Sequence, residues 1–320
     1  MNAFTYERYG SPEELNLSAV EKPTPAAEEV LVKIEVISLN PADWRLLRAD
    51  PAFMRLERGL FQPKMPVIGG EIAGRIEAVG PSVTRFKPGD LVFGEIGTGG
   101  FAEFACAAEE KFELVPSSVS LEAAATVSLA GGAALKALTT FGKIKTGESI
   151  LINGASGGVG TFTIQLAKHF GATVTAVCSR RNLELVCSLG ADQVIDYTQT
   201  DFTRTGDSYD LIVDNVGNRS VKELNRILAP GGRCALVGFT TLGHMLQSMA
   251  RGVWISSRSD KKIGPMAIDP TSEDRAFLGN LLAEGEIVPV IDRRYPFAQM
   301  PEALSYLESG RARGKVIVTQ

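Results

Sequence analysis

The chain has 320 residues, of which 44% are hydrophobic and 22% charged, and its formal net charge is −4. This length suits about two domains, and the composition is that of a globular protein rather than a disordered or fibrous one. Because no Lys/Arg run or basic tail is present, nucleic acid is not expected as a partner.

The cysteines and the apolar stretches set the expected compartment. Four cysteines lack the dense spacing of a disulfide framework, so we expect buried thiols and a cytoplasmic location: Cys106, Cys178, Cys187 and Cys234. The first ten residues lack the apolar core of a secretory signal. The longest apolar stretch, residues 123–135, is too short to span a bilayer and predicts a buried helix.

Two patterns follow one another along the chain. Residues 1–120 favour an antiparallel β domain, with strands expected at 30–36, 71–79 and 91–93. From residue 121 to 268, strands and helices alternate, which predicts a parallel, doubly wound sheet. Its expected strands are 149–152, 173–177, 193–195, 211–213 and 234–237, and its expected helices are 159–170, 183–189 and 220–228, the last one stopped by Pro230-Gly231-Gly232.

The last fifty residues break this alternation. They predict one helix after Pro301, ended by Gly310, and a terminal strand at 315–318. We expect this tail to return to the first domain. The predicted domains are therefore residues 1–120 with 269–320, and residues 121–268.

A glycine-rich turn at residues 153–160 separates an expected strand from an expected helix. The spacing Gly154-x-x-Gly157-x-x-Gly160 is a variant of the dinucleotide fingerprint, in which a pyrophosphate meets free N–H groups at the helix N-terminus. A P-loop is excluded because no Lys follows Gly160. The turn also contains G-x-S-x-G, so a serine hydrolase with Ser156, Asp214 and His244 is an alternative, although no His lies near the chain end.

The type of dinucleotide depends on the end of the second strand. An acidic residue there would bind the ribose 2′-OH of NAD, but the chain has Cys178-Ser179-Arg180-Arg181. A hydroxyl beside guanidinium groups suits a 2′-phosphate, so the sequence predicts NADPH. The alternative is that the arginines only begin the next helix in solvent.

Many ordered stretches of the sequence match one family. The chain resembles the zinc-independent medium-chain dehydrogenases/reductases, specifically quinone oxidoreductase and its relatives. The matching stretches include residues 29–33, Asn40-Pro41-Ala42-Asp43, residues 69–74, 86–90, 189–192 and 314–318. The resemblance implies an α/β protein with a GroES-like β domain, a Rossmann doubly wound parallel-sheet domain and a cleft between them.

The resemblance also implies residue roles. Asn40 and Thr126 would line the reaction cleft, and Lys315 would reach the pyrophosphate. The remaining implied cofactor residues surround the phosphates or follow the nicotinamide half: Ala155, Ser156, Gly157, Gly158, Val159, Gly160, Ser179, Arg180, Tyr197, Asn215, Val237 and Phe239. Relatives are often dimers, which implies a homodimer.

The chain departs from the zinc-containing members of this family. Cys stands there where this chain has Leu39-Asn40-Pro41, and His where it has Gly70, so the ligands for a catalytic zinc are missing. Without a metal to polarise a ketone, quinones, enones and enals are the expected hydride acceptors.

The residues that would serve such an acceptor have alternative roles. Asn40 and Arg45 are candidate donors to the developing oxyanion, although Asn40 could equally cap the turn at Pro41. Arg48, Arg55 and Arg58 could be a solvated helix face or could favour an anionic substrate. A non-catalytic NADPH-binding protein is the alternative function, because the same fold would support it.

Overall fold

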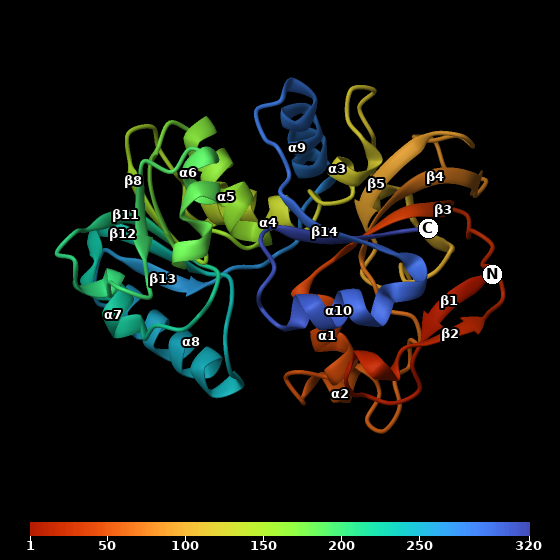
Figure 1. Ribbon diagram of the computed structural model, residues 1–320, viewed down its shortest axis with the longest axis horizontal. Helices are drawn as coiled ribbons and strands as arrows, with labels where there is room; N and C mark the ends of the chain where they lie inside the picture. Colours follow the sequence, from red (N-terminus) through yellow and green to blue (C-terminus); the bar gives the residue numbers. More distant parts are fainter. The chain divides into compact units, whose positions relative to one another are not determined.

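A computed structural model describes all residues, 1–320, and divides the chain into two compact units. Unit 1 comprises residues 1–129 and 270–320, and unit 2 comprises residues 130–269. The sequence predicts these boundaries after residues 120 and 268, so the first lies nine residues and the second one residue earlier than in the structure. The class is α/β, with one mixed sheet, one parallel sheet and one small antiparallel sheet of two strands (Figure 1).

Unit 1 is built on a seven-stranded sheet of order β14-β15-β3-β4-β5-β7, in which β6 also pairs with β3. Only β14 and β15 run parallel, whereas the other pairs are antiparallel. The strands of this sheet are β3 (Glu29–Leu39), β4 (Glu71–Val79), β5 (Leu91–Glu95), β6 (Phe104–Ala108), β7 (Phe112–Leu114), β14 (Ile291–Pro296) and β15 (Lys315–Thr319). A separate two-stranded antiparallel sheet is formed by β1 (Asn2–Thr5) and β2 (Asn16–Ala19).

Helices flank this sheet and complete unit 1. They are α1 (Pro41–Arg48), α2 (Met54–Arg58), α3 (Leu121–Ala124), α9 (Ser272–Glu284) and α10 (Met300–Glu308). The predicted return of the tail is observed, because β15 pairs with β3. The expectation of a single helix in the last fifty residues is wrong: α9 begins at the Thr271 cap, whose capping box with Asp274 was not recognised.

Unit 2 has a six-stranded parallel sheet of order β10-β9-β8-β11-β12-β13. The central strand β8 is buried on both faces, with Ile150, Leu151 and Ile152 fully inaccessible, as a parallel sheet between helices requires. The strands are β8 (Ser149–Asn153), β9 (Thr173–Cys178), β10 (Gln193–Asp196), β11 (Tyr209–Asp214), β12 (Leu228–Leu236) and β13 (Lys262–Pro265). The helices are α4 (Ala130–Lys136), continued by a π-helical turn (Ala137–Phe141), α5 (Gly158–His169), α6 (Leu183–Ser188), α7 (Val221–Arg226) and α8 (Leu242–Ser256).

Three local expectations need correction. The helix predicted across residues 123–135 is interrupted, because the Leu129 N–H donates to the Glu71 carboxylate at 2.7 Å instead of to a helical carbonyl. Helix α7 ends at Arg226, before Pro230-Gly231-Gly232, because Leu228 already pairs with Tyr209 in the sheet. Cys178 and Cys234 are buried as expected, but Cys187 is exposed and Cys106 is only partly buried. No helix of the structure is long and apolar enough to cross a lipid bilayer.

Candidate functional site

The glycine-rich turn of unit 2 has the geometry expected of a phosphate cradle. Gly154 adopts φ +76°, a conformation that L side chains rarely adopt. A Cβ on Gly160 would lie 2.3 Å from the Gly154 carbonyl oxygen, so only glycine lets α5 start this close to β8. The N–H groups of Gly158, Val159 and Gly160 form the first turn of α5 and have no intrahelical acceptor.

The other predicted cofactor residues follow neighbouring strands of the same sheet. Asn215 follows β11, and Val237 and Phe239 follow β12, so both segments lie at the carboxyl edge that also carries the glycine turn. The two segments contact each other closely, since a Cβ on Gly238 would lie 2.1 Å from the Asn215 carbonyl oxygen. Asp214 stabilises the segment that contains Asn215, because Asp214 Oδ1 accepts from the N–H groups of Val216 and Gly217 at 3.2 and 3.0 Å.

The ends of β9 and β10 form a separate corner of this edge. Asp196 pairs with Cys178 in register, and the Tyr197 N–H donates to the Cys178 carbonyl at 3.1 Å. Ser179 and the exposed Arg180 therefore lie beside the half-exposed Tyr197. The pKa of Asp196 is lowered, first by the Thr198 hydroxyl and backbone N–H and then by Arg180. A carboxylate thus stands at this corner, although on the third strand rather than the second.

The residues at this edge of the sheet fit a bound dinucleotide, because they leave polar atoms unpaired and space open. Neither polar atom of the Asn215 amide has a hydrogen-bond partner, although both are buried. Such orphaned atoms need a partner that the protein itself does not supply. A Cβ on Gly157 would meet only the Gly154 carbonyl oxygen, at 3.5 Å, so the space in front of the turn is open. When bound there, a nicotinamide dinucleotide would supply a hydride.

The hydrolase alternative is not assembled in unit 2. The Ser156 hydroxyl accepts from Asn182 Nδ2 at 2.8 Å rather than bonding to a histidine. His244 Nε2 is paired with the Arg219 carbonyl at 3.1 Å, and its Nδ1 has no partner. Burial raises the pKa of Asp214, whose Oδ1 serves the adjacent turn. A triad needs a serine–histidine contact that is absent here.

Unit 1 contains a buried polar cluster around Glu71. This carboxylate is fully inaccessible, and its Oε2 accepts from Ser38 Oγ at 2.8 Å, Asn40 Nδ2 at 2.9 Å and Lys315 Nζ at 2.9 Å. Its Oε1 accepts from the Leu129 N–H at 2.7 Å. The charge is therefore compensated by one cation and three further donors, as burial requires.

Asn40 and Lys315 are brought together in this cluster. Lys315 Nζ donates to Asn40 Oδ1 at 2.6 Å and also approaches the Leu39 carbonyl at 3.3 Å. Together with Glu71, these acceptors engage all three ammonium protons. Asn40 Nδ2 donates to both Ser38 O and Glu71. The pyrophosphate role of Lys315 stays a prediction, and it would require the ammonium to leave one of these acceptors.

Arg45 and Thr126 are placed apart from these contacts. Arg45 Nη1 pairs with Asp50 Oδ2 at 2.8 Å, and its guanidinium lies 4.7 Å from the centroid of the Trp44 ring. The buried Thr126 hydroxyl donates to the Ala123 carbonyl at 2.8 Å.

Sequence reasoning missed Glu71 and Asp43. Asp43 accepts from the Asn40 N–H at 2.7 Å as part of the cap of α1, and burial raises its pKa to about 7. The signal for Asp43 was available, because an acidic residue three positions after Asn40 is typical of a helix start. Glu71 gave no such local signal, since its partners come from distant segments.

The family resemblance implies a zinc ligand at the position of Gly70 in the zinc-containing members. A Cβ there would lie 2.7 Å from Glu95 Oε1 and 3.1 Å from the Gly97 carbonyl oxygen, so a His would require Glu95 to move. No group of three or more His, Cys, Asp or Glu side chains is arranged to hold a metal ion.

Two family models match the chain: "Alcohol dehydrogenase GroES-like domain" over residues 26–118 and "Zinc-binding dehydrogenase" over residues 189–318. The chain is 34% identical to a chloroplast envelope quinone oxidoreductase homolog of Arabidopsis thaliana, over 99% of this chain and 98% of the relative. It is 32% identical to an NADPH-dependent alkenal/one oxidoreductase of the same plant, over 99% of this chain and 79% of the relative. The structure of a quinone oxidoreductase from Coxiella burnetii superimposes on this chain with a TM-score of 0.89 and 27% sequence identity, over 100% of this chain and 99% of the other.

Proposed function

The chain belongs to the quinone oxidoreductase branch of the medium-chain dehydrogenase/reductase family and is an oxidoreductase, and we propose that it transfers hydride from NADPH to a quinone or a conjugated enone or enal without zinc. One observation carries this proposal furthest: the open first turn of α5 and the orphaned Asn215 amide lie on one sheet edge with Ser179 and Arg180.

The preference for NADPH rests on the corner formed by Ser179, Arg180 and Tyr197. Arg180 is exposed and can offer charge-assisted hydrogen bonds to a 2′-phosphate. Asp196 beside it would repel that phosphate but would also orient the guanidinium. The relative that reduces alkenals and alkenones is named as NADPH-dependent, which agrees with this preference.

The proposed acceptors follow from the groups at hand. Asn40 and Gly70 stand where relatives carry zinc ligands, so a Lewis acid is not expected to polarise the acceptor. A quinone or conjugated carbonyl needs less polarisation, because the negative charge spreads onto its oxygen. Hydrogen-bond donors then suffice to stabilise that oxygen.

We assign Asn40, Arg45 and Thr126 to the substrate side of the reaction. Asn40 can donate to a substrate oxygen only by releasing Ser38 or Glu71, because both amide hydrogens are engaged. Alternatively, it serves by holding the Lys315 ammonium in position. In the first role, Asn40→Ala should lower turnover more than NADPH affinity. In the second role, Asn40→Ala should lower NADPH affinity, and Lys315→Met should do the same.

The competing function is a protein that binds NADPH without turnover. A spectrophotometric screen of NADPH oxidation against quinones, enones, enals and saturated ketones separates the two. Turnover that requires a conjugated acceptor supports the enzyme, and affinity without turnover on any acceptor supports the binding protein. If saturated ketones were the best substrates, the proposed reaction class would have to be abandoned. Ser156→Ala should leave turnover largely intact, whereas a hydrolase would lose its nucleophile.

We further propose a homodimer located in the cytoplasm. The family resemblance supports the dimer, and the four cysteines, none of which is disulfide-bonded, support the location. Light scattering coupled to gel filtration checks the first, and microscopy of the tagged protein checks the second.

A further inference from the structure

Residues 53–65, which we call the α2 segment, expose an unusual number of large apolar side chains. The exposed fractions are 53% for Phe53, 78% for Leu56, 53% for Leu60, 85% for Phe61 and 45% for Met65. The segment comprises α2 and the loop that follows it in unit 1 (Figure 1). Scattered exposed apolar residues are ordinary, but five within such a short stretch indicate an interaction surface.

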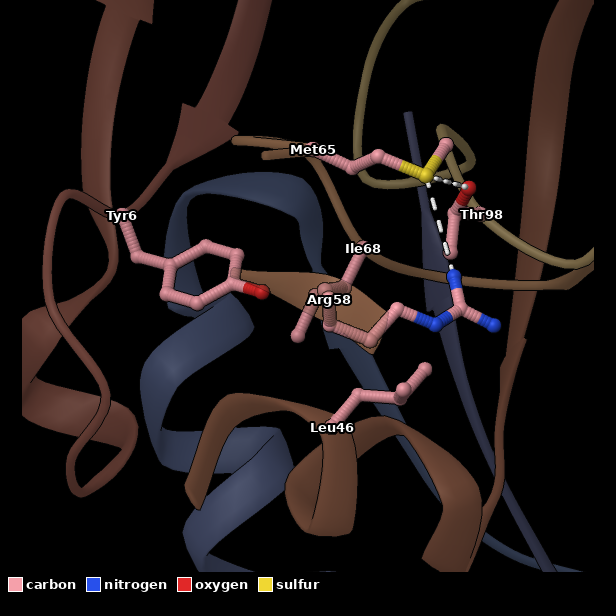
Figure 2. A pocket seen from close by; sticks show the side chains of 6 residues that line it. All are labelled: Tyr6, Leu46, Arg58, Met65, Ile68 and Thr98. Atoms are coloured by element: carbon pink, nitrogen blue, oxygen red, sulfur yellow. Dashed lines mark hydrogen bonds between the residues drawn. The ribbon is translucent and has the colours of Figure 1, made fainter. Parts of the chain in front are cut away.

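Basic side chains lie among these apolar ones without acidic partners. Arg58 Nη1 donates to Met65 Sδ at 3.7 Å, a weak acceptor, at the edge of a pocket that Tyr6 and Leu46 also line (Figure 2). Lys64 Nζ donates to a backbone carbonyl at 3.2 Å, and the Arg55 guanidinium lies 4.9 Å from the centroid of the Tyr9 ring. None of the three cations forms an ion pair with a carboxylate, and with the exposed Glu57, whose carbonyl accepts from Lys64, three cations and one anion give the segment a net charge of +2. The cations remain available to an external anion.

We propose that the α2 segment docks the protein onto the surface of an anionic lipid bilayer. Phe61 and Leu56, the most exposed apolar side chains, would enter the boundary between headgroups and acyl chains. Arg55, Arg58 and Lys64 would then lie at the level of the lipid phosphates. Because the whole chain carries a net charge of −4, the attraction arises from this local cluster and falls with rising salt concentration.

A bilayer explains the segment better than a protein partner does. A standard protein interface uses about 20–30 residues a side, more than this segment offers. The loop contains Pro63 and ends before Pro66, so it presents no regular strand edge to which a partner could add.

Co-sedimentation with lipid vesicles tests this inference independently of enzymatic activity. The full-length protein is mixed with vesicles of phosphatidylcholine alone or of phosphatidylcholine with phosphatidylglycerol, at low and high salt. The apolar variant is Leu56→Ser/Phe61→Ser, and the charge variants are Arg55→Gln, Arg58→Gln and Lys64→Gln. The matched control is Val253→Ser/Trp254→Ser on α8 in unit 2, where the two side chains are 68% and 57% exposed. Thermal melts verify that each variant folds.

We expect salt-sensitive binding to the anionic vesicles only. Each charge variant should lower the partition coefficient about fivefold, and the apolar variant at least about tenfold, while the α8 control leaves it unchanged. Equal binding to neutral and anionic vesicles, no binding to either, or an equal loss in the α8 control would overturn the proposal. Concentration-dependent self-association that only the apolar variant abolishes, without vesicle binding, would instead make the segment an interface between copies of the chain.

Discussion

Lys315 Nζ lies 2.9 Å from Glu71 Oε2, and neither side chain is more than 3% exposed. The two residues are separated by 244 positions in the chain. The pair therefore joins β15, contributed by the tail, to the start of β4. It is a buried ion pair whose remaining donors and acceptors are satisfied within unit 1, so removing either charge leaves the other uncompensated.

We expect Lys315→Met and Glu71→Gln each to destabilise the protein by about 3–5 kcal/mol, because a buried charge loses its partner. The double variant should be more stable than the sum of the two losses implies. Urea unfolding of the four proteins measures this coupling. The control is Lys168→Met, whose partner Asp192 is 39% exposed, and which should cost no more than about 1 kcal/mol. Additive losses in the buried pair would contradict the assignment.

Asp43 should give stability a distinctive dependence on pH. Burial raises its pKa from 3.8 to about 7, against the lowering effects of the Asn40 N–H and Lys315. Between about pH 4 and 7 the folded protein then binds a proton that the unfolded chain has released, so the contribution of Asp43 to stability falls as pH rises through this window. Asp43→Asn should remove that fall, which is on the order of a few kcal/mol.

The check is the unfolding free energy of wild type and Asp43→Asn measured from pH 4 to 8. Asp192→Asn provides a control of opposite sign. The Lys168 ammonium holds the pKa of Asp192 below its ordinary value. The ionised Asp192 therefore stabilises the fold at pH values above that ordinary pKa, and this stabilisation is lost as the pH falls through the lowered pKa. Parallel pH profiles for wild type and Asp43→Asn would show that Asp43 is ionised throughout.

Two glycines of the turn should respond differently to alanine. A methyl group at Gly160 would lie 2.3 Å from the Gly154 carbonyl oxygen, so Gly160→Ala should destabilise unit 2. At Gly157 the same group would lie 3.5 Å from that oxygen, and the backbone φ of −83° suits alanine. Gly157→Ala should therefore keep the melting temperature but weaken NADPH binding, because the methyl group occupies the phosphate approach. Thermal melts and fluorescence titration decide between these outcomes. Unchanged NADPH affinity in Gly157→Ala would argue against this turn as the phosphate site.

Asn215 should act on the cofactor rather than on stability. Its amide has no partner in the protein, so Asn215→Ala should weaken NADPH binding by about 1–3 kcal/mol without lowering the melting temperature. Asn153→Ala is the matched control. Asn153 Nδ2 donates to the buried Asp214 at 2.8 Å, so its loss should destabilise the fold. A stability loss in Asn215→Ala with unchanged affinity would sink the assignment.

Arg180 should discriminate between the two nicotinamide cofactors. Arg180→Ala should narrow the difference between NADPH and NADH affinity by about 1–3 kcal/mol, as a charge-assisted hydrogen bond to the 2′-phosphate is lost. Arg181→Ala, a neighbour not assigned to the phosphate, should change the difference less. The dissociation constants of both cofactors provide the measurement, and equal values for them in the wild type would refute the preference.

The sequence by itself determined the features that depend on local backbone geometry. Hydrophobic runs of strand length gave β4 with the observed bounds and β8 to within one residue. Gly154 and Gly160 could be identified because a tight strand–helix turn demands glycine at fixed spacing. Counting along one βαβ unit predicted Arg180 as a ligand of the 2′-phosphate, and this role stays a prediction. Each of these inferences needs only residues that are close together in the chain.

Only the tertiary structure decided which distant groups satisfy one another. Glu71 accepts hydrogen bonds from donors near the end of β3, in β15 and in the segment before α4. The bond from the Leu129 N–H interrupts the expected helix, and the bond from Asn40 Nδ2 engages that amide. The sequence left Asn40 as either a donor to the oxyanion or a cap of the turn at Pro41, and the family resemblance implied Lys315 as a pyrophosphate ligand. Neither prediction could include Glu71, because strand register is invisible before the sheet forms. A buried charge takes whichever partners the completed fold brings within hydrogen-bond distance, and no local pattern encodes that choice.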